Sequence, residues 1–277
     1  MYDEIFRPII AGLFMGWANV IPGIGGGTIA VIMGIFERFI DVINDIMEFK
    51  ISRKDIAFIA TLAIGILIGV ITGSKLLTWA FQNHPFYTYS FFFGLILFSL
   101  WNFRKEVSKF RFFEFVVGFL IVVVPYFFKS GQSHVTSVVG GLGYFFLALA
   151  GVIAGAAMVL PGISGSLLLM LMGYYEAAIK TVSKLTKIAS GGFTISDLLF
   201  ILTLGIGVLI GIGTISKLLK IWFEKAKLSV LNFILGLIAG SLYPITPAYH
   251  GTGNVFGMFL WIAIGGLVVY TLGQFEK

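Results

Sequence analysis

The sequence predicts an all-α, polytopic integral membrane protein made of two inverted-topology repeats of about five helical segments each. Three observations predict it. The mean hydropathy of +1.00, with 58% hydrophobic and only 12% charged residues, exceeds what a water-soluble surface tolerates. About eight to ten continuous apolar stretches approach the ~20 residues that one crossing needs, without the alternation typical of barrel strands. Finally, the sequence repeats itself.

The repeat covers most of the chain. Three pairs of segments align without gaps: 12–37 with 151–176 (11 of 26 identical), 55–77 with 197–219 (15 of 23) and 91–100 with 233–242 (6 of 10). Apolar composition alone would not keep Asp55 in register with Asp197, or Lys75 with Lys217. We therefore predict two membrane repeats, residues 1–130 and 131–277.

Each half divides into five predicted helical segments, in the same order. They are expected at 8–21, 24–46, 55–80, 86–101 and 112–128, and at 142–160, 163–183, 197–222, 229–244 and 256–273. The first two segments of each half are separated only by a Pro-Gly break, so they are either full spans or the two arms of a re-entrant hairpin. Either choice leaves an odd number of crossings, which would place the second half upside down relative to the first.

The basic residues predict the orientation. Most lie in links that this topology places on one side, which should be cytoplasmic: Arg7, Lys50, Arg53, Lys54, Arg104, Lys105, Lys109, Arg111, Lys220, Lys225, Lys227 and Lys277. Lys180, Lys184 and Lys187 fall on the other side, so either the topology is wrong there or these lysines attract an anion. The net charge of +6 is explained by these links and anionic lipid, and we expect no nucleic-acid partner.

The two Pro-Gly breaks are the candidate site. Residues 21–28 read IPGIGGGT and residues 160–166 read LPGISGS. Proline and clustered glycine end one helix and begin another, which leaves backbone N–H groups that hydrocarbon cannot satisfy. Two such turns facing each other would bind a phosphate or carboxylate through N–H and hydroxyl donors. The expected binding residues are Pro22, Gly23, Gly25, Gly26, Gly27, Thr28, Pro161, Gly162, Ser164, Gly165 and Ser166, with Asn19 beside the first break.

A structural alternative stays open for these glycines. They would equally permit close helix packing, as Gly65, Gly69, Gly207 and Gly211 are expected to do at i, i+4 spacing. The first break is not a nucleotide-binding P-loop, because no Gly-Lys-Ser/Thr follows it and no strand precedes it.

Several charged residues recur in both halves. Glu37 and Glu176 are candidates for coupling transport to a proton or sodium ion, or else are interfacial anchors. Lys75 and Lys217 either contact phosphate or extend to the headgroups. Asp55 and Asp197 are expected to be helix N-caps.

The two motifs resemble a known bacterial family. Residues 15–28 (MGWANVIPGIGGGT) and 33–37 (MGIFE), with 157–166 (AMVLPGISGS) and 173–176 (GYYE), resemble the polyprenyl-phosphate (undecaprenyl-phosphate) transporter family, formerly domain of unknown function 368. The resemblance implies a multi-pass protein of the cytoplasmic membrane that returns undecaprenyl phosphate for peptidoglycan and envelope synthesis. This chain has Asn19 and Gly25 where the family often has Asp and Ser, so any ion coupling through that Asp must differ here.

We predict a transporter and not an enzyme. There is no cysteine, and the three histidines lie far apart, so no metal site and no cofactor are expected. The predicted mechanism is alternating access, with the phosphate headgroup at the breaks and the tail in lipid. A transporter or channel for a small soluble anion is the alternative.

Overall fold

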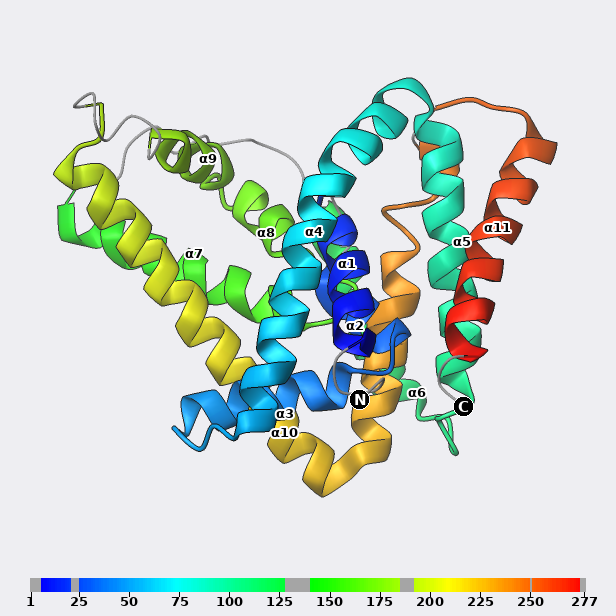
Figure 1. Cartoon of the computed structure of the whole chain (residues 1–277), viewed down its shortest axis with the longest axis horizontal. Coiled ribbons are helices and arrows are strands. Elements are labelled where there is room, and N and C mark those ends of the chain that lie inside the picture. Colours follow the sequence, from blue (N-terminus) through cyan, green and yellow to red (C-terminus); the bar gives the residue numbers. More distant parts are fainter. Residues whose placement is uncertain (1–5, 21–24, 128–139, 185–191, 250, 275–277) are drawn as a thin grey trace.

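The computed structural model describes residues 6–20, 25–127, 140–184, 192–249 and 251–274, which form helices and connecting loops without a strand (Figure 1). The elements follow in this order: α1 (Arg7–Val20), α2 (Gly26–Ile32), α3 (Phe36–Met47), α4 (Arg53–Asn83), α5 (Pro85–Arg104), α6 (Phe112–Phe127), α7 (Gly140–Val159), α8 (Gly165–Leu171), α9 (Tyr175–Ser183), α10 (Ile195–Ser241), the 3-10 helix η3 (Pro247–Tyr249) and α11 (Val255–Gln274). The predicted all-α class is confirmed for this part of the chain.

Among the described residues, six helical stretches are strongly apolar, and they differ in length. Three helical stretches are long and apolar enough to cross a membrane, at Arg53–Gly73, Gly140–Val159 and Ile195–Ser241. Three shorter apolar helices lie at Pro85–Trp101, Phe112–Pro125 and Val255–Thr271. The number of membrane crossings therefore stays a prediction.

The second segment of each half is the main error. A continuous helix was expected over 24–46 and over 163–183, but each is broken, at Gly34 (φ 62°) and Gly173 (φ 79°). Beyond Gly34, the N–H of Ile35 donates to the carbonyl of Ala30 at 2.9 Å, and the bond from Tyr174 to Leu169 repeats this at 2.9 Å. These bonds close a Schellman motif, which requires a left-handed residue that glycine adopts at little cost.

Glycine seams hold the first helix of each half against the fourth, α1 against α4 and α7 against α10. A Cβ on Gly65 would overlap the carbonyl oxygen of Ile9, and one on Gly69 would overlap that of Leu13. In the second half, Gly207 and Gly211 approach the carbonyls of Ala148 and Val152 in the same way. The prediction that these four glycines permit close packing is confirmed, because α1 lies directly on α4 and α7 on α10.

The remaining helices pack across the two halves. A Cβ on Gly94 of α5 would overlap the carbonyl of Ile262 on α11, and one on Gly236 of α10 would overlap that of Phe115 on α6. Thus α5 pairs with α11 and α6 pairs with the C-terminal part of α10.

A kink divides α10. Ala226 has non-helical dihedral angles (φ −153°, ψ 57°) inside this 47-residue helix. The chain reverses direction there, descending before the kink and ascending after it (Figure 1). The two parts correspond to the segments expected at 197–222 and 229–244.

The links expected on one side lie at one edge of the molecule. The α3–α4 link, the α5–α6 link and the kink of α10 all lie at the lower edge in Figure 1. Helix α9 and the α4–α5 link lie at the upper edge. The largest cluster of buried apolar side chains lies between these edges, around α1, α2 and α3, and extends to Val159 and Ile238. Both helix breaks adjoin this core.

Candidate functional site

The structure brings the two helix breaks into direct contact. The backbone N–H of Gly162 donates to Oγ1 of Thr28 at 2.7 Å, a bond that joins residues 134 positions apart. The side chain of Thr28 is fully buried. The second break leaves the Gly162 N–H without a partner in a helix, and a buried N–H without a partner is costly. The Thr28 hydroxyl accepts its hydrogen bond and removes that cost. The prediction that the two breaks face each other is confirmed for these two residues.

Backbone packs on backbone around this bond. A Cβ on Gly25 would overlap the carbonyl oxygen of Ile163, and one on Gly27 would lie 2.5 Å from that of Val159. Gly162 has a φ of +82°, and a Cβ there would overlap the carbonyl of Leu237 on α10. In this conformation Gly25, Gly27 and Gly162 therefore permit close packing of backbone on backbone. Close packing was the alternative to anion binding that the sequence left open.

The hydroxyls of the second break remain closer to the surface. Ser164 is 7% exposed and Ser166 is partly buried, and their Oγ atoms lie 2.8 Å apart. Gly26, Pro161 and Gly165 are also buried. The hydroxyl donors of the second break are thus these two serines, whose O–H groups would donate hydrogen bonds to an anion's oxygens.

Some expected site residues cannot be placed. Pro22 and Gly23 lie outside the described residues, and so do the side chains of Asn19 and Lys75. Lys217 is exposed on α10. It lies near the C-terminal end of α3, where its charge adds to the lowering of the pKa of Glu48 that a hydrogen bond from Lys50 mainly causes.

The coupling candidates lie in exposed ion pairs on the short helices. Glu37 of α3 is 54% exposed and accepts from Lys227 Nζ at 2.8 Å. Glu176 of α9 is 52% exposed and pairs with Lys180 at 3.2 Å. A role in coupling stays a prediction for both, while the geometry favours the alternative of structural pairs.

The expected N-caps are confirmed. Ser52 and Asp55 form a reciprocal capping box at the start of α4, as Thr194 and Asp197 do at the start of α10. Each carboxylate also accepts from a basic residue of the preceding segment, Asp55 from Arg38 at 2.6 Å and Asp197 from Lys184 at 2.8 Å. Lys184 and Lys180 therefore have carboxylate partners, and Lys187 lies outside the described residues.

Sequence reasoning missed a serine beside the site. Ser241 is fully buried, and its Cβ would lie 3.3 Å from a Cβ on Gly162. Its Oγ donates to the carbonyl of Ile238 at 2.7 Å, as Ser99 does to Ile96. The identity of Ser99 and Ser241 in the repeat was the available signal.

An acidic face on α3 was also missed. Asp41 and Asp45 each lie 3.8 Å from Lys220 Nζ on α10, beyond the pair of Glu37 with Lys227. This seam joins α3 of the first half to α10 of the second. The acidic residues Glu37, Asp41 and Asp45 recur every four residues, which is visible in the sequence. The sequence does not show that α10 supplies their basic partners.

Metal ligands do not gather in the part of the chain that is described. No group of three or more His, Cys, Asp and Glu side chains lies together among those residues.

Comparison with known proteins places the chain in a family. The family described as "VCA0040-like: Undecaprenyl phosphate translocase-like" matches residues 15–256. A polyprenyl-phosphate transporter of Vibrio cholerae is 32% identical over 250 residues, covering 86% of this chain and 76% of the relative. One of Staphylococcus aureus is 30% identical over 280 residues, covering 96% and 95%. No solved structure matches the chain. With one family covering both helix breaks and most of the chain, the protein belongs to the undecaprenyl phosphate translocase-like family.

Proposed function

We propose that this protein translocates a polyprenyl phosphate, such as undecaprenyl phosphate, across the cytoplasmic membrane for reuse as a lipid carrier in envelope synthesis. The relatives named polyprenyl-phosphate transporters support the substrate. The observation that carries the location of the site is the direct contact between the breaks, through Gly162 N–H and Thr28 Oγ1.

Two inverted halves, 1–130 and 131–277, are part of this proposal. The recurrence of the same glycine contacts in α1–α4 and α7–α10 supports it. The packing of α5 on α11 and of α6 on the C-terminal part of α10 also supports it, because each pair joins the fourth segment of one half to the fifth segment of the other. The short helices α3 and α9 follow the two breaks and lie at opposite edges in Figure 1, as inverted repeats require.

The mechanism is alternating access in which the contact between the breaks opens. The conformation described here is closed, because Thr28 is fully buried and Gly25 and Gly27 pack on the second break. Separation of the breaks would release the Gly162 N–H and the Thr28 hydroxyl together. These groups, with Ser164 and Ser166, would then hold the phosphate while the tail stays in lipid.

The serines give the most direct test. Protein in liposomes should move labelled polyprenyl phosphate between leaflets, and a Ser164→Ala/Ser166→Ala variant should do so about tenfold more slowly, because hydrogen bonds to a charged group are lost. Ser90→Ala is the matched control, since Ser90 is buried on α5 and bonded only to the carbonyl of Phe86 at 2.7 Å. Full transport in the double variant would rule out the serines as phosphate ligands.

A small soluble anion is the competing substrate. In the same liposomes, excess inorganic phosphate should leave lipid movement unchanged if the substrate is a lipid phosphate. Uptake of labelled phosphate that polyprenyl phosphate does not inhibit would favour the soluble anion. Imposed proton or sodium gradients, with Glu37→Gln and Glu176→Gln, test whether these carboxylates couple transport to an ion or serve only in structural ion pairs.

A further inference from the structure

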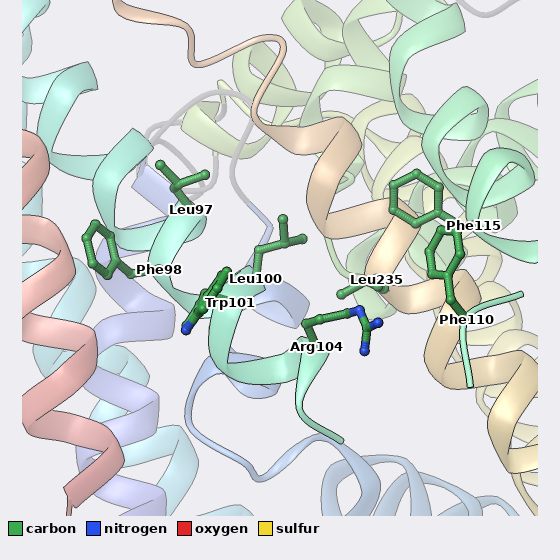
Figure 2. Close-up of a pocket in the computed structure, with 8 residues that line it drawn as sticks. All are labelled: Leu97, Phe98, Leu100, Trp101, Arg104, Phe110, Phe115 and Leu235. Atoms are coloured by element: carbon green, nitrogen blue, oxygen red, sulfur yellow. The ribbon is translucent and has the colours of Figure 1, made fainter. Parts of the chain in front are cut away.

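An apolar groove separates the two pairs of helices that cross between the halves. It has a volume of about 550 Å³ and is lined by Leu97, Phe98, Leu100, Trp101, Arg104, Phe110, Phe115 and Leu235. Helix α5 provides one wall, while α6 and the C-terminal part of α10 provide the other (Figure 2). Because α5 packs chiefly on α11, and α6 on α10, the groove lies where these two pairs meet.

One charged residue lines this otherwise apolar groove. Figure 2 shows Arg104 extending from α5 across the groove toward Leu235 and Phe110. Its Nη1 donates to the carbonyl of Val107 at 3.1 Å, which uses one of the five N–H donors of a guanidinium. The side chain is exposed. A cation at the end of an apolar groove matches a ligand with a hydrocarbon chain and an anionic head.

The groove lies at the end of the apolar stretch of α5, which is where lipid headgroups are expected. Arg104 ends α5 just beyond its apolar stretch Pro85–Trp101. Trp101 is 72% exposed, as is typical of tryptophan at a membrane interface. The α5–α6 link that follows lies at the same edge as the α10 kink (Figure 1) and carries Lys105, Lys109 and Arg111. This is the basic edge, and basic pockets between helices on the cytoplasmic side attract anionic headgroups.

We propose that the groove binds one anionic phospholipid of the cytoplasmic leaflet. Its acyl chain lies along Leu97, Leu100 and Leu235, and its phosphate pairs with the Arg104 guanidinium. The lipid would fill the gap between the α5–α11 pair and the α6–α10 pair. Charge complementarity favours a lipid over a second copy of the chain, because another copy would bring its own basic edge to the same place.

Native mass spectrometry of the purified protein tests this proposal, using phosphatidylglycerol and phosphatidylcholine with the same acyl chains. We expect one phosphatidylglycerol to bind more tightly than phosphatidylcholine. Arg104→Gln should weaken its binding about fivefold, because one cationic contact is removed. Arg104→Lys should retain most of the binding, and Arg53→Gln is the matched control, since Arg53 is an exposed arginine at the start of α4 outside the groove.

A second variant distinguishes the contribution of the apolar groove to lipid binding from that of the Arg104 charge. Leu97 is 37% exposed at the groove, so Leu97→Trp should fill it and reduce binding without removing a cation. Equal binding of the two lipids, unchanged affinity in Arg104→Gln, or a dimer that excludes lipid would overturn the proposal. So would displacement of phosphatidylglycerol by an equimolar polyprenyl phosphate, which would assign the groove to the substrate. None of these outcomes depends on transport being observed.

Discussion

The two helix breaks have matched sequences but different surroundings. In the first break, Thr28 is fully buried and Gly27 packs against the backbone of Val159. In the second, the residue matched to Gly27 is Ser166, which is partly buried and shares a hydrogen bond with Ser164. One break therefore supplies the close contact that closes the site, and the other supplies hydroxyls beside it.

This difference teaches that a duplicated motif need not give a symmetric site. The first break has three consecutive glycines, which allow backbone to approach backbone without a side chain between. The second replaces two of the matched glycines by serine, which adds hydrogen-bonding capacity at the cost of that approach. We therefore expect the glycines of the first break to matter most for stability, and the two serines of the second break to matter more for phosphate binding than for stability.

Gly27→Ala should have the largest effect on stability. Its Cβ would lie 2.5 Å from the carbonyl oxygen of Val159, and both groups belong to buried backbone. We expect a loss of about 3 kcal/mol, at the upper end of overpacking costs, measured as a lower melting temperature in detergent. Gly205→Ala is the matched control, because nothing lies within 4 Å of a Cβ there. If both variants melt alike, the breaks are not in close contact.

Thr28→Val should follow, with a loss of about 2 kcal/mol. Valine keeps the shape but leaves the buried Gly162 N–H without an acceptor. Thr28→Ser restores the hydroxyl and should recover most of the stability. An equally destabilised Thr28→Ser would mean that the methyl group, and not the hydrogen bond, matters. The measurement is again thermal unfolding of the purified protein.

The serines of the second break should affect stability least among these residues. Ser164→Ala/Ser166→Ala removes one partly buried hydrogen bond, so we expect a loss of about 1 kcal/mol or less. Thermal unfolding and the liposome transport assay, carried out on the same double variant, measure its losses of stability and of transport together. A large loss of stability with unchanged transport would reverse the roles assigned to the two breaks.

Much of this comparison was predictable from local sequence. The matched Asp55 and Asp197 indicate capping boxes, because the capping residue lies three positions earlier in the chain. Proline and glycine likewise indicate where the breaks fall. The internal break at Gly34 was missed, since an apolar run with one glycine resembles a continuous helix.

Contacts between the halves were not predictable in the same way. The bond from Gly162 to Thr28 depends on how two distant segments meet, and so does the pairing of α5 with α11. A single sequence carries no direct signal for such partners. The groove at Arg104 was not predictable for the same reason. Arg104 and Leu235 both line it, but they lie far apart in the chain and meet only through the packing of the helices.

The acidic face of α3 gives the smallest expected effect and tests a second difference between the halves. Helix α3 forms ion pairs with α10 of the other half, through Lys220 and Lys227, whereas Glu176 of α9 pairs within its own helix. Burial raises the pKa of Asp41 above its usual value of 3.8, although Lys220 at 3.8 Å acts to lower it. The charged form of Asp41 is thus disfavoured in the folded state.

Asp41→Asn should therefore stabilise the protein slightly at neutral pH. With the pKa raised on folding, the folded state holds the proton more tightly, so the contribution of Asp41 to stability falls as the pH rises above 3.8 through the folded pKa. Because the side chain is 49% exposed, we expect a gain of only about 0.5 kcal/mol at pH 7, disappearing near pH 4. Thermal unfolding from pH 4 to pH 8 measures it, with the exposed Glu224→Gln as control. A variant that is less stable at pH 7 would mean that attraction to Lys220 outweighs burial, and that the α3–α10 seam holds the halves together through charge.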